Sequence, residues 1–414
     1  MTETTVTGED QAARLRQEMT GKLIAEEFIG SPEAEAAFRK VPREAFSPGD
    51  FPLETVYATH EVLRGRRDAS GTVLSSVSAP WLQARMIAQA GIAPGMRVLE
   101  VGGGGYNAAL LAEITGTAGR VVSVDIDPGV TARASAALNT TGHIGQVEAV
   151  TADAGNRVPA GPYDAIIVTA GAWDIAPAWL ENLAPDGTLV VPLRMNGVTR
   201  SIGFRRSGGH LASTSAQVCG FVPFQGTTAY SERSFVLPLP AGGEASLRFE
   251  DNAPQQIPVA ADVLAGEPSE AWSGLTTENM VSFADLFLWC SGFLSGYCRV
   301  SLDEDTLPGG RRPADGLGRY ACSCVYDGSV AYLATRPRFG NDSELGARAY
   351  GPRAAAAAGL LVDHIRQWNA HGRDLPGTAF AYWPTGTIVL QSDAPTSMFF
   401  KVNGTMAVTW HPET

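Results

Sequence analysis

The stretch Arg97-Val-Leu-Glu-Val-Gly-Gly-Gly-Gly-Tyr106 runs from apolar residues and one acid into four consecutive glycines. An apolar strand, then a turn without Cβ atoms, then a helix is typical of a parallel sheet that brings its backbone close to a nucleotide-like ligand. The helix is expected directly afterwards, because residues 107–114 read Asn-Ala-Ala-Leu-Leu-Ala-Glu-Ile. The stretch therefore predicts the first strand of a doubly wound α/β sheet and its ligand-binding turn.

The glycine spacing favours one kind of cofactor over another. A dinucleotide site needs Gly-x-Gly-x-x-Gly to hold a pyrophosphate at the helix N-terminus. Gly102 and Gly104 fit the first two positions, but the third falls on Asn107. Glu100 lies two residues before the first glycine, where its carboxylate could face a cationic group. S-adenosyl-L-methionine has a sulfonium, an ammonium and no phosphate, so this turn suits it better than it suits NAD.

Strand and helix patterns alternate along the chain from this stretch onward. The expected strands are 97–101, 120–125, 146–151, 163–169 and 188–192, with helices at 108–114, 130–138 and 176–183 between them. Alternation at this spacing indicates a doubly wound, mostly parallel sheet. Together with the cofactor that the glycine turn favours, it leads us to expect the Rossmann-like fold of an S-adenosyl-L-methionine-dependent methyltransferase. Before the sheet, residues 48–73 are irregular and rich in Gly and Pro, and loops of this length are usually functional.

The composition changes at Leu237-Pro-Leu-Pro-Ala-Gly-Gly243, which is expected to be a domain linker. Residues 1–238 are then the cofactor-binding catalytic domain. Residues 243–414 are a smaller α+β domain with short strands and one long helix over about 352–369. Two domains are the natural expectation for a chain of 414 residues.

Composition and charge exclude several classes of protein. With 44% hydrophobic and 18% charged residues, the chain is a globular protein, and its net charge of −12 argues against a nucleic-acid partner. The apolar runs are too short to cross a bilayer, and the polar N-terminal residues do not resemble a signal peptide. A cytoplasmic protein without a membrane segment is expected. Its five cysteines are then thiols, and their spacing predicts no metal site.

The candidate cofactor contacts fall at successive strand ends, where ligands bind in this fold. Asp125 ends the second strand, where an acid can accept both ribose hydroxyls. Asp153 and Ala154 follow the third strand, where the acid can receive an adenine amino group, and Thr169 ends the fourth. Each has an alternative, because Asp125 could cap the helix near Pro128 and Asp153 could be a loop acid. Four such residues in register favour S-adenosyl-L-methionine.

Four segments resemble those of a known protein family, both in their residues and in their order along the chain. They are Val41-Pro-Arg-Glu-Ala-Phe46, Val77-Ser78-Ala-Pro80, Ala84-Arg85-Met86 and Val98-Leu-Glu-Val-Gly102 with Tyr106. Over residues 30–235 the chain resembles protein L-isoaspartyl (D-aspartyl) O-methyltransferase. The resemblance implies transfer of a methyl group to a carboxylate, with Ser78 hydrogen-bonded to the accepting carboxylate. Ser78 could equally be a helix N-cap, and both roles can hold together.

Two departures bear on the substrate. Residues 68–76, Asp-Ala-Ser-Gly-Thr-Val-Leu-Ser-Ser, replace the family's Gly-Gln-rich substrate loop, and the chain continues far beyond residue 238. The segments 285–289, 331–335 and 349–352 look like the extra domain of homologues that modify ribosomally made peptides, such as lanthipeptides and graspetides. That likeness implies methylation of an aspartate in a cross-linked precursor peptide, which leads to succinimide (aspartimide) or isoaspartate. The extra domain then recognises the modified peptide, or it is a lid or dimerisation module.

Three other functions stay open. One is an O-methyltransferase that acts on a small molecule, although the Ser78-Ala-Pro80 segment argues against it. A repair-type isoaspartyl methyltransferase with an accessory domain would prefer a short isoaspartyl peptide to a cross-linked precursor. A non-catalytic protein that only binds a precursor peptide would keep its function when Ser78 or Asp125 is replaced by alanine. Trp173-Asp174 could line the acceptor pocket, although Asp174 could also cap the helix near Ala176.

Overall fold

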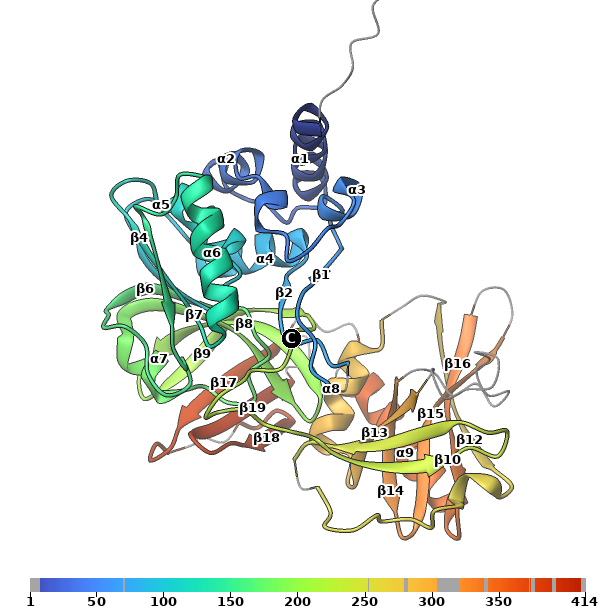
Figure 1. The fold of residues 1–414 in the computed structure, drawn as a ribbon. Helices are drawn as coiled ribbons and strands as arrows, with labels where there is room; N and C mark the ends of the chain where they lie inside the picture. Colours follow the sequence, from blue (N-terminus) through green and yellow to red (C-terminus); the bar gives the residue numbers. More distant parts are fainter. Residues whose placement is uncertain are drawn as a thin grey trace, which may run out of the picture.

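The computed structural model of the chain describes residues 8–69, 71–251, 253–278, 282–303, 320–338, 342–371, 373, 377–388 and 392–410. Within these residues the strands form a ten-stranded sheet, a seven-stranded sheet and a two-stranded hairpin. Figure 1 shows the N-terminal helices above the larger sheet, and the smaller sheet beside it. No helix in this described part has the length and apolarity needed to cross a membrane.

Short helices and the hairpin precede the large sheet. They are α1 (Gly8–Ala25), α2 (Pro32–Lys40), the 3-10 helix η1 (Arg43–Phe46), α3 (Leu53–Val56), the hairpin strands β1 (Leu63–Arg64) and β2 (Ser76–Val77), and α4 (Pro80–Ala90). Their apolar side chains share one core with α5 and with the sheet residues Val98, Val121 and Val190. The segment expected to be irregular, residues 48–73, therefore contains α3 and the first strand of the hairpin.

The central strands and helices alternate as expected. The elements are β3 (Arg97–Val101), α5 (Tyr106–Thr115), β4 (Arg120–Asp125), α6 (Pro128–Thr140), β5 (Val147–Thr151), β6 (Tyr163–Val168), α7 (Pro177–Asn182) and β7 (Leu183–Met195). The pairs β3–β4, β4–β5, β3–β6 and β6–β7 are all parallel. The strand order β7-β6-β3-β4-β5 reverses beside β3, so the glycine turn lies at the switch point. The predicted doubly wound α/β fold is confirmed.

Antiparallel strands extend this sheet beyond β7. They are β8 (Val198–Ser207), β9 (His210–Val218), β17 (Thr378–Pro384), β18 (Thr396–Phe400) and β19 (Gly404–Trp410), and the full order is β18-β19-β17-β9-β8-β7-β6-β3-β4-β5. Residues 378–410 thus return to the catalytic sheet, whereas the sequence places everything after residue 243 in a second domain. The reason is physical: β17 pairs with β9 at Ala212 and Leu211, a long-range pairing that no local pattern encodes.

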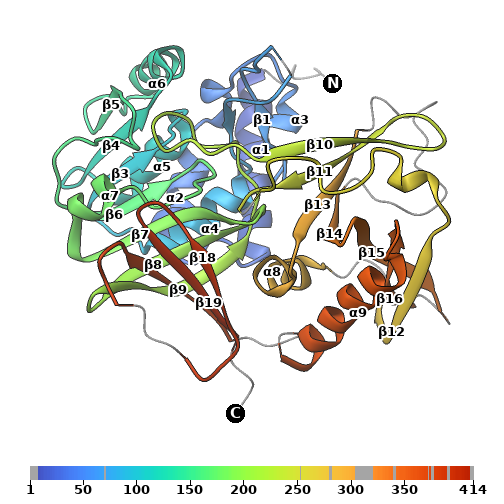
Figure 2. The ribbon, with the colours of Figure 1, turned by 90° about the horizontal axis from the view of Figure 1, so that it is seen from below.

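The seven-stranded sheet is built from the residues between. It contains β10 (Arg233–Pro238), β11 (Glu244–Phe249), β12 (Ser269–Glu278), β13 (Tyr297–Asp303), β14 (Tyr320–Tyr326), β15 (Ser329–Pro337) and β16 (Asp342–Tyr350), with η2 (Val263–Ala265), α8 (Ala284–Phe293) and α9 (Ala354–His371). Figure 2 shows α8 between the two sheets and α9 along the smaller one. Side chains of both helices and both sheets, including Phe204, Trp289, Leu361 and Trp410, form one continuous core.

The dipeptide Trp173-Asp174 ties the C-terminal strands to the catalytic sheet. Trp173 stacks on Tyr230 with 4.1 Å between ring centroids, and the Lys401 ammonium lies 4.4 Å from the Trp173 ring. Asp174 accepts hydrogen bonds from the Tyr382 hydroxyl (2.6 Å) and the Asn403 N–H (2.7 Å). Neither alternative considered for Asp174 from the sequence describes it, because Ala176 is the N-cap of α7 and the carboxylate faces the C-terminal strands.

Candidate active site

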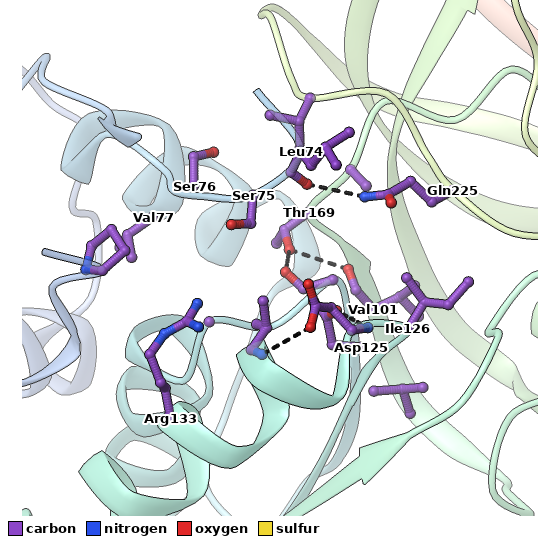
Figure 3. A pocket seen from close by; sticks show the side chains of 18 of the residues that line it. Leu74, Ser75, Ser76, Val77, Val101, Asp125, Ile126, Arg133, Thr169 and Gln225 are labelled. Atoms are coloured by element: carbon purple, nitrogen blue, oxygen red, sulfur yellow. Dashed lines mark hydrogen bonds between the residues drawn. The ribbon is translucent and has the colours of Figure 1, made fainter. Parts of the chain in front are cut away.

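A cavity lies at the carboxyl ends of the parallel strands, between the sheet, α6 and the hairpin (Figure 3). It encloses about 940 Å³ of unfilled space, part of it open to solvent. Apolar side chains from the strand ends and from residues 222–224 form much of its wall. Its lining includes Val77, Val101, Gly102, Gly104, Val124, Asp125, Ile126, Val130, Ala154, Thr169, Ala170, Val222, Pro223, Phe224 and Gln225.

The glycine turn is compact because side chains would collide there. Gly102 has a φ of +93°, a left-handed conformation that favours glycine. A Cβ on Gly103 would lie 2.1 Å from the Ser123 hydroxyl oxygen and 2.3 Å from a Glu100 carboxylate oxygen. The Thr169 hydroxyl lies 2.7 Å from the Gly102 carbonyl and 3.1 Å from the Val101 carbonyl, so it fixes the turn to the end of β6.

Glu100 lies beneath the turn with one carboxylate oxygen unused. Its Oε2 accepts a hydrogen bond from the Ser123 hydroxyl (2.6 Å), whereas Oε1 is buried and has no partner within the described residues. Burial raises the pKa of Glu100, and the Ser123 hydroxyl opposes that shift. Glu100 lines a smaller cavity that adjoins the first, together with Ser78, Tyr106 and Asn107. A buried acceptor without a partner fits a cationic ligand group.

Asp125 and its neighbour Asp127 have separate roles. Asp127 is the N-cap of α6, and its Oδ1 accepts from the Gly129 N–H at 2.7 Å, so the capping alternative does not apply to Asp125. Asp125 lines the cavity, and its one hydrogen bond within the described part of the chain comes from the Asp127 N–H at 2.8 Å. Burial raises the pKa of Asp125 to about 6, and the Asp127 carboxylate raises it further. The rest of its carboxylate is available to a ligand, as the close-up shows (Figure 3).

Asp153 is turned away from the cavity, unlike its neighbour Ala154. Its two carboxylate oxygens accept from the Gly155 N–H (2.9 Å) and the Thr227 N–H (2.7 Å). The carboxylate thus holds the backbone of residues 226–227 against the end of β5. Ala154, by contrast, lines the cavity. Asp153 lines neither cavity, so its contact with an adenine amino group stays a prediction from the sequence.

Ser78 lies at the smaller cavity, between β2 and α4. The N-cap of α4 is Ala79, which makes no side-chain cap, so Ser78 is not the cap considered from the sequence. The same cavity is lined by Gly102, Gly104 and Thr169, which also line the larger one. The structure thus brings together Ser78, Glu100, Gly102, Gly104, Asp125, Ala154 and Thr169 around two adjoining cavities.

Two segments of the wall were not predicted as cofactor contacts. The hairpin contributes Leu74, Ser75, Ser76 and Val77, and its position is fixed by Gln225, whose Nε2 donates to the Leu74 carbonyl at 3.0 Å (Figure 3). The length of the 48–73 loop indicates function, but not which of its residues face the cavity. Residues 222–225 lie on an irregular segment, and no sequence signal marks them.

Comparison with known proteins gives the family. The fold and the strand-end cavity define an S-adenosyl-L-methionine-dependent methyltransferase. The sequence model of the protein-L-isoaspartate(D-aspartate) O-methyltransferase (PCMT) family matches residues 14–229, slightly more than half of the chain. The chain belongs to this family, whose members are carboxyl methyltransferases.

Two relatives agree with this assignment in sequence, and one solved structure is also similar to the chain. The protein-L-isoaspartate O-methyltransferase of Methanopyrus kandleri is 32% identical over 231 residues, which are 53% of this chain and 95% of the relative. That of Methanoculleus marisnigri is 37% identical over 187 residues, 44% of this chain and 79% of the relative. A solved structure titled protein-L-isoaspartate O-methyltransferase is 21% identical, covers 88% of this chain and 96% of its own, and has a TM-score of 0.49.

Proposed function

We propose that this chain transfers the methyl group of S-adenosyl-L-methionine to an L-isoaspartyl carboxylate in peptides or proteins. The observation that carries the proposal is the position of Ser78 at a cavity that adjoins the strand-end cavity across the glycine turn. A serine hydroxyl at this point can donate to an acceptor carboxylate beside a bound cofactor. Family membership and the match over residues 14–229 support the same activity.

The wall of each cavity suits a different part of the cofactor. The larger cavity offers an apolar wall for the adenine and the Asp125 carboxylate as acceptor for the ribose hydroxyls. The smaller cavity offers Glu100 Oε1 to the ammonium group, and the Tyr106 hydroxyl and Asn107 amide nitrogen there also have no partners within the described residues. The assignment to the ammonium group accounts for Glu100 Oε1, a buried acceptor without a partner among the described residues.

The reaction needs positioning more than proton transfer. When bound, the cofactor supplies an electrophilic methyl group on a sulfonium. An acceptor carboxylate, with a pKa near 4, is already ionised at neutral pH and needs no general base. The Ser78 hydroxyl would donate to one carboxylate oxygen and leave the other aligned for attack. Excluding water from the carboxylate and orienting it are the contributions expected of this chain.

A second candidate acceptor is an aspartate in a ribosomally made, cross-linked precursor peptide. Two observations favour it: the hairpin connection has an unusual sequence over residues 68–76, and a seven-stranded sheet is inserted before the last strands of the catalytic sheet. Both add surface that a simple isoaspartyl peptide does not require. Methylation there would lead to succinimide or isoaspartate, so the chemistry at the carboxylate is the same and only the acceptor differs.

Mass spectrometry after incubation with the cofactor separates these functions. Three acceptors are compared: an isoaspartyl peptide, the same peptide with ordinary aspartate, and a cross-linked precursor. Gain of a methyl group on the isoaspartyl peptide supports the main proposal, and gain only on the precursor supports the second candidate. If cofactor binds and none of the three is methylated, the chain is a non-catalytic binding protein instead.

Replacing Ser78 tests its role directly. Ser78→Ala should lower kcat about tenfold to a hundredfold, because the acceptor loses a hydrogen-bond donor, while the dissociation constant of the cofactor changes less than about twofold. Ser207→Ala, at the exposed end of β8, is the matched control and should leave both constants as they are. Equal kcat values for Ser78→Ala and the unaltered chain would remove Ser78 from the acceptor site.

A further inference from the structure

The pairing between β9 and β17 leaves part of a strand edge open. Only Leu211 and Ala212 of β9 pair with β17, although β9 continues to Val218. At the next position, the Phe380 N–H donates to the Ser213 hydroxyl (2.9 Å) rather than to the β9 backbone. Beyond it the two strands diverge. Among the residues that the structure describes, residues 215–218 pair only with β8, and Thr214 is a bulge residue between the paired positions 213 and 215.

The open edge presents backbone groups that can bind another strand. The Cys219 N–H bonds to the Thr199 carbonyl, and hydrogen-bonded positions alternate along an antiparallel pair. By this alternation, Ser201–Gln217 is a hydrogen-bonded pair, whereas the N–H and C=O groups of Ala216 and Val218 point away from β8. Natural proteins normally protect such an edge, so an exposed one suggests a partner strand.

Cavities lie on both faces of this edge. On the face that packs on α8, a cavity of about 1120 Å³, open to solvent, is lined by Thr214, Ala216, Asp285, Leu288 and Thr378 among others. On the opposite face, that of α4, a second cavity of about 830 Å³ is lined by Arg85, Gln89 and the same β9 residues. The two helices belong to the cores on opposite sides of the sheet. An added strand directs alternate side chains to opposite faces, and each would meet a cavity.

The chain connects this edge to the cofactor cavity. β9 runs antiparallel to β8 toward the end of the sheet that carries the glycine turn, and residues 222–225, a few positions after Val218, line the cofactor cavity. Figure 2 shows β9 in the same sheet as β6 and β3, with α8 beside it. A strand added at the open edge of β9 would lie four strand spacings from β6, which is roughly 19 Å, or about six residues of extended chain.

We infer that the open edge of β9, residues 214–218, binds an extended segment of the acceptor polypeptide as an additional strand. The inference rests on the proposed methylation of a polypeptide and specifies how that polypeptide is held. Arg85 has no carboxylate partner among the described residues, its Nε donating instead to Gln217 Oε1 at 3.3 Å. The segment that binds is therefore expected to carry an acidic side chain on the α4 face. The methylated residue lies about six residues from the paired segment.

Peptide length provides the kinetic test. Two isoaspartyl peptides are compared, one of about five residues and one of about fifteen with acidic residues flanking the same acceptor. The longer peptide should have a kcat/KM about tenfold higher, mainly because its KM is lower. Ala216→Pro removes the N–H that faces the open edge and should abolish the preference for the longer peptide. Ala216→Ser keeps that N–H and should retain the preference. Equal kcat/KM values for the two peptides with the unaltered chain would overturn the inference.

Hydrogen exchange separates failure of this inference from failure of the proposed function. The amides of residues 216 and 218 are measured in the unaltered chain, with S-adenosylhomocysteine present, before and after addition of the longer peptide. Protection that appears only with the peptide supports strand addition, even if neither peptide is methylated or Ala216→Pro does not fold. Amides already protected in the free protein, or unaffected by a peptide that is methylated, would show that the edge is not the docking site.

Discussion

Asp125 and Asp127 show how surroundings give two identical side chains different roles. The Asp127 side chain accepts hydrogen bonds from the Gly129 and Val130 N–H groups in the first turn of α6. Asp125 is buried at the cofactor cavity, accepts one backbone hydrogen bond and has a pKa of about 6 because burial disfavours its charged form. A ligand that donates hydrogen bonds to the carboxylate favours the charged form and therefore binds best when Asp125 is ionised.

Cofactor affinity should therefore depend on pH. Below about pH 6 the free protein holds a proton on Asp125 and must release it on binding, so the dissociation constant should rise by up to about tenfold per pH unit as pH falls. Above pH 7 the affinity should be constant. Calorimetric titration of S-adenosylhomocysteine between pH 5 and 8 measures this, within the range set by the shifted pKa.

Substitution assigns that pH dependence to one group. Asp125→Asn should weaken binding about tenfold or more and flatten the pH profile, since the amide does not titrate. Glu148→Gln, on the exposed side of β5, is the control and should keep the profile of the unaltered chain. A slope that persists in Asp125→Asn would mean that another group titrates.

Thr169 offers a second test at the residue scale. Thr169→Val keeps the shape of the side chain but removes the hydroxyl that bonds the Gly102 and Val101 carbonyls. The free energy of unfolding should fall by about 1 kcal/mol, and cofactor affinity should fall several-fold because the glycine turn is less well fixed. Thr169→Ser retains the hydroxyl and should stay close to the unaltered chain in thermal unfolding and calorimetry. Similar behaviour of the two variants would show that the hydroxyl is unimportant.

The sequence predicted the positions of some cavity residues but not of others. Asp125 and Thr169 were found because strand-end positions in a parallel sheet converge on one edge, a rule that needs no tertiary detail. Asp153 occupies such a position too, but it lines neither cavity, and its carboxylate accepts hydrogen bonds from the backbone of Gly155 and Thr227. Thr227 lies more than seventy residues after Asp153 in the chain, so no local sequence pattern predicts this contact.

At the scale of elements, the buried Arg43 connects the N-terminal helices. Its guanidinium donates to the Val56 carbonyl (2.8 Å) and to Gln83 Oε1 (3.0 Å), and it lies 5.0 Å from the centre of the Tyr106 ring. It thus joins η1, the end of α3, α4 and the first residue of α5. Burial lowers the pKa of Arg43 to about 10, so it stays charged at neutral pH. The motif Val41–Phe46 could be recognised from sequence, but these partners could not.

Arg43→Met should be strongly destabilising. The Val56 carbonyl and Gln83 Oε1 would lose their donor, and the free energy of unfolding should fall by about 3 kcal/mol in urea titration. Arg39→Met, four residues earlier in the chain, is the matched control, because the ion pair of Arg39 with Glu35 is partly exposed and lies within one helix. That variant should lose less than about 1 kcal/mol. Equal losses would mean that Arg43 contributes no more than a surface ion pair.

Elements were predicted well where their pattern is local. The central strands and helices were found because apolar runs, glycine turns and helix starts repeat at short intervals. The hairpin of β1 and β2 was missed because its two strands have two residues each and pair across the Gly-rich connection. What holds it over the cavity is remote: Arg66 pairs with Asp127 at 3.0 Å, and Gln225 donates to Leu74.

At the scale of the whole molecule, the two sheets depend on one another. The last strands of the chain complete the catalytic sheet, and Trp173-Asp174 binds residues from both the smaller sheet and the β18–β19 connection. Composition suggested a division near residue 240, and a composition change does occur there. The return of residues 378–410 could not be foreseen, because strands in antiparallel sheets look alike whichever sheet they join.

A truncated chain tests this dependence. Residues 1–243 alone would lose the partner of β9 and expose the core side chains that face Trp289, Tyr382 and Trp410. The truncated protein should be poorly soluble or lack the cooperative unfolding transition of the full chain, measured by scanning calorimetry. A truncated chain that binds S-adenosylhomocysteine with full affinity and unfolds at the same temperature would establish an independent catalytic domain.

The order of strands also constrains how the protein is made. β3 to β9 leave the ribosome early, but the strands that finish their sheet are translated only after the whole smaller sheet. A nascent chain that has reached residue 371 still has an open β9 and an exposed apolar surface where β17 to β19 will pack. Until those last residues emerge, this half-built sheet is a natural client for chaperones, and slow translation of the intervening residues prolongs its exposure.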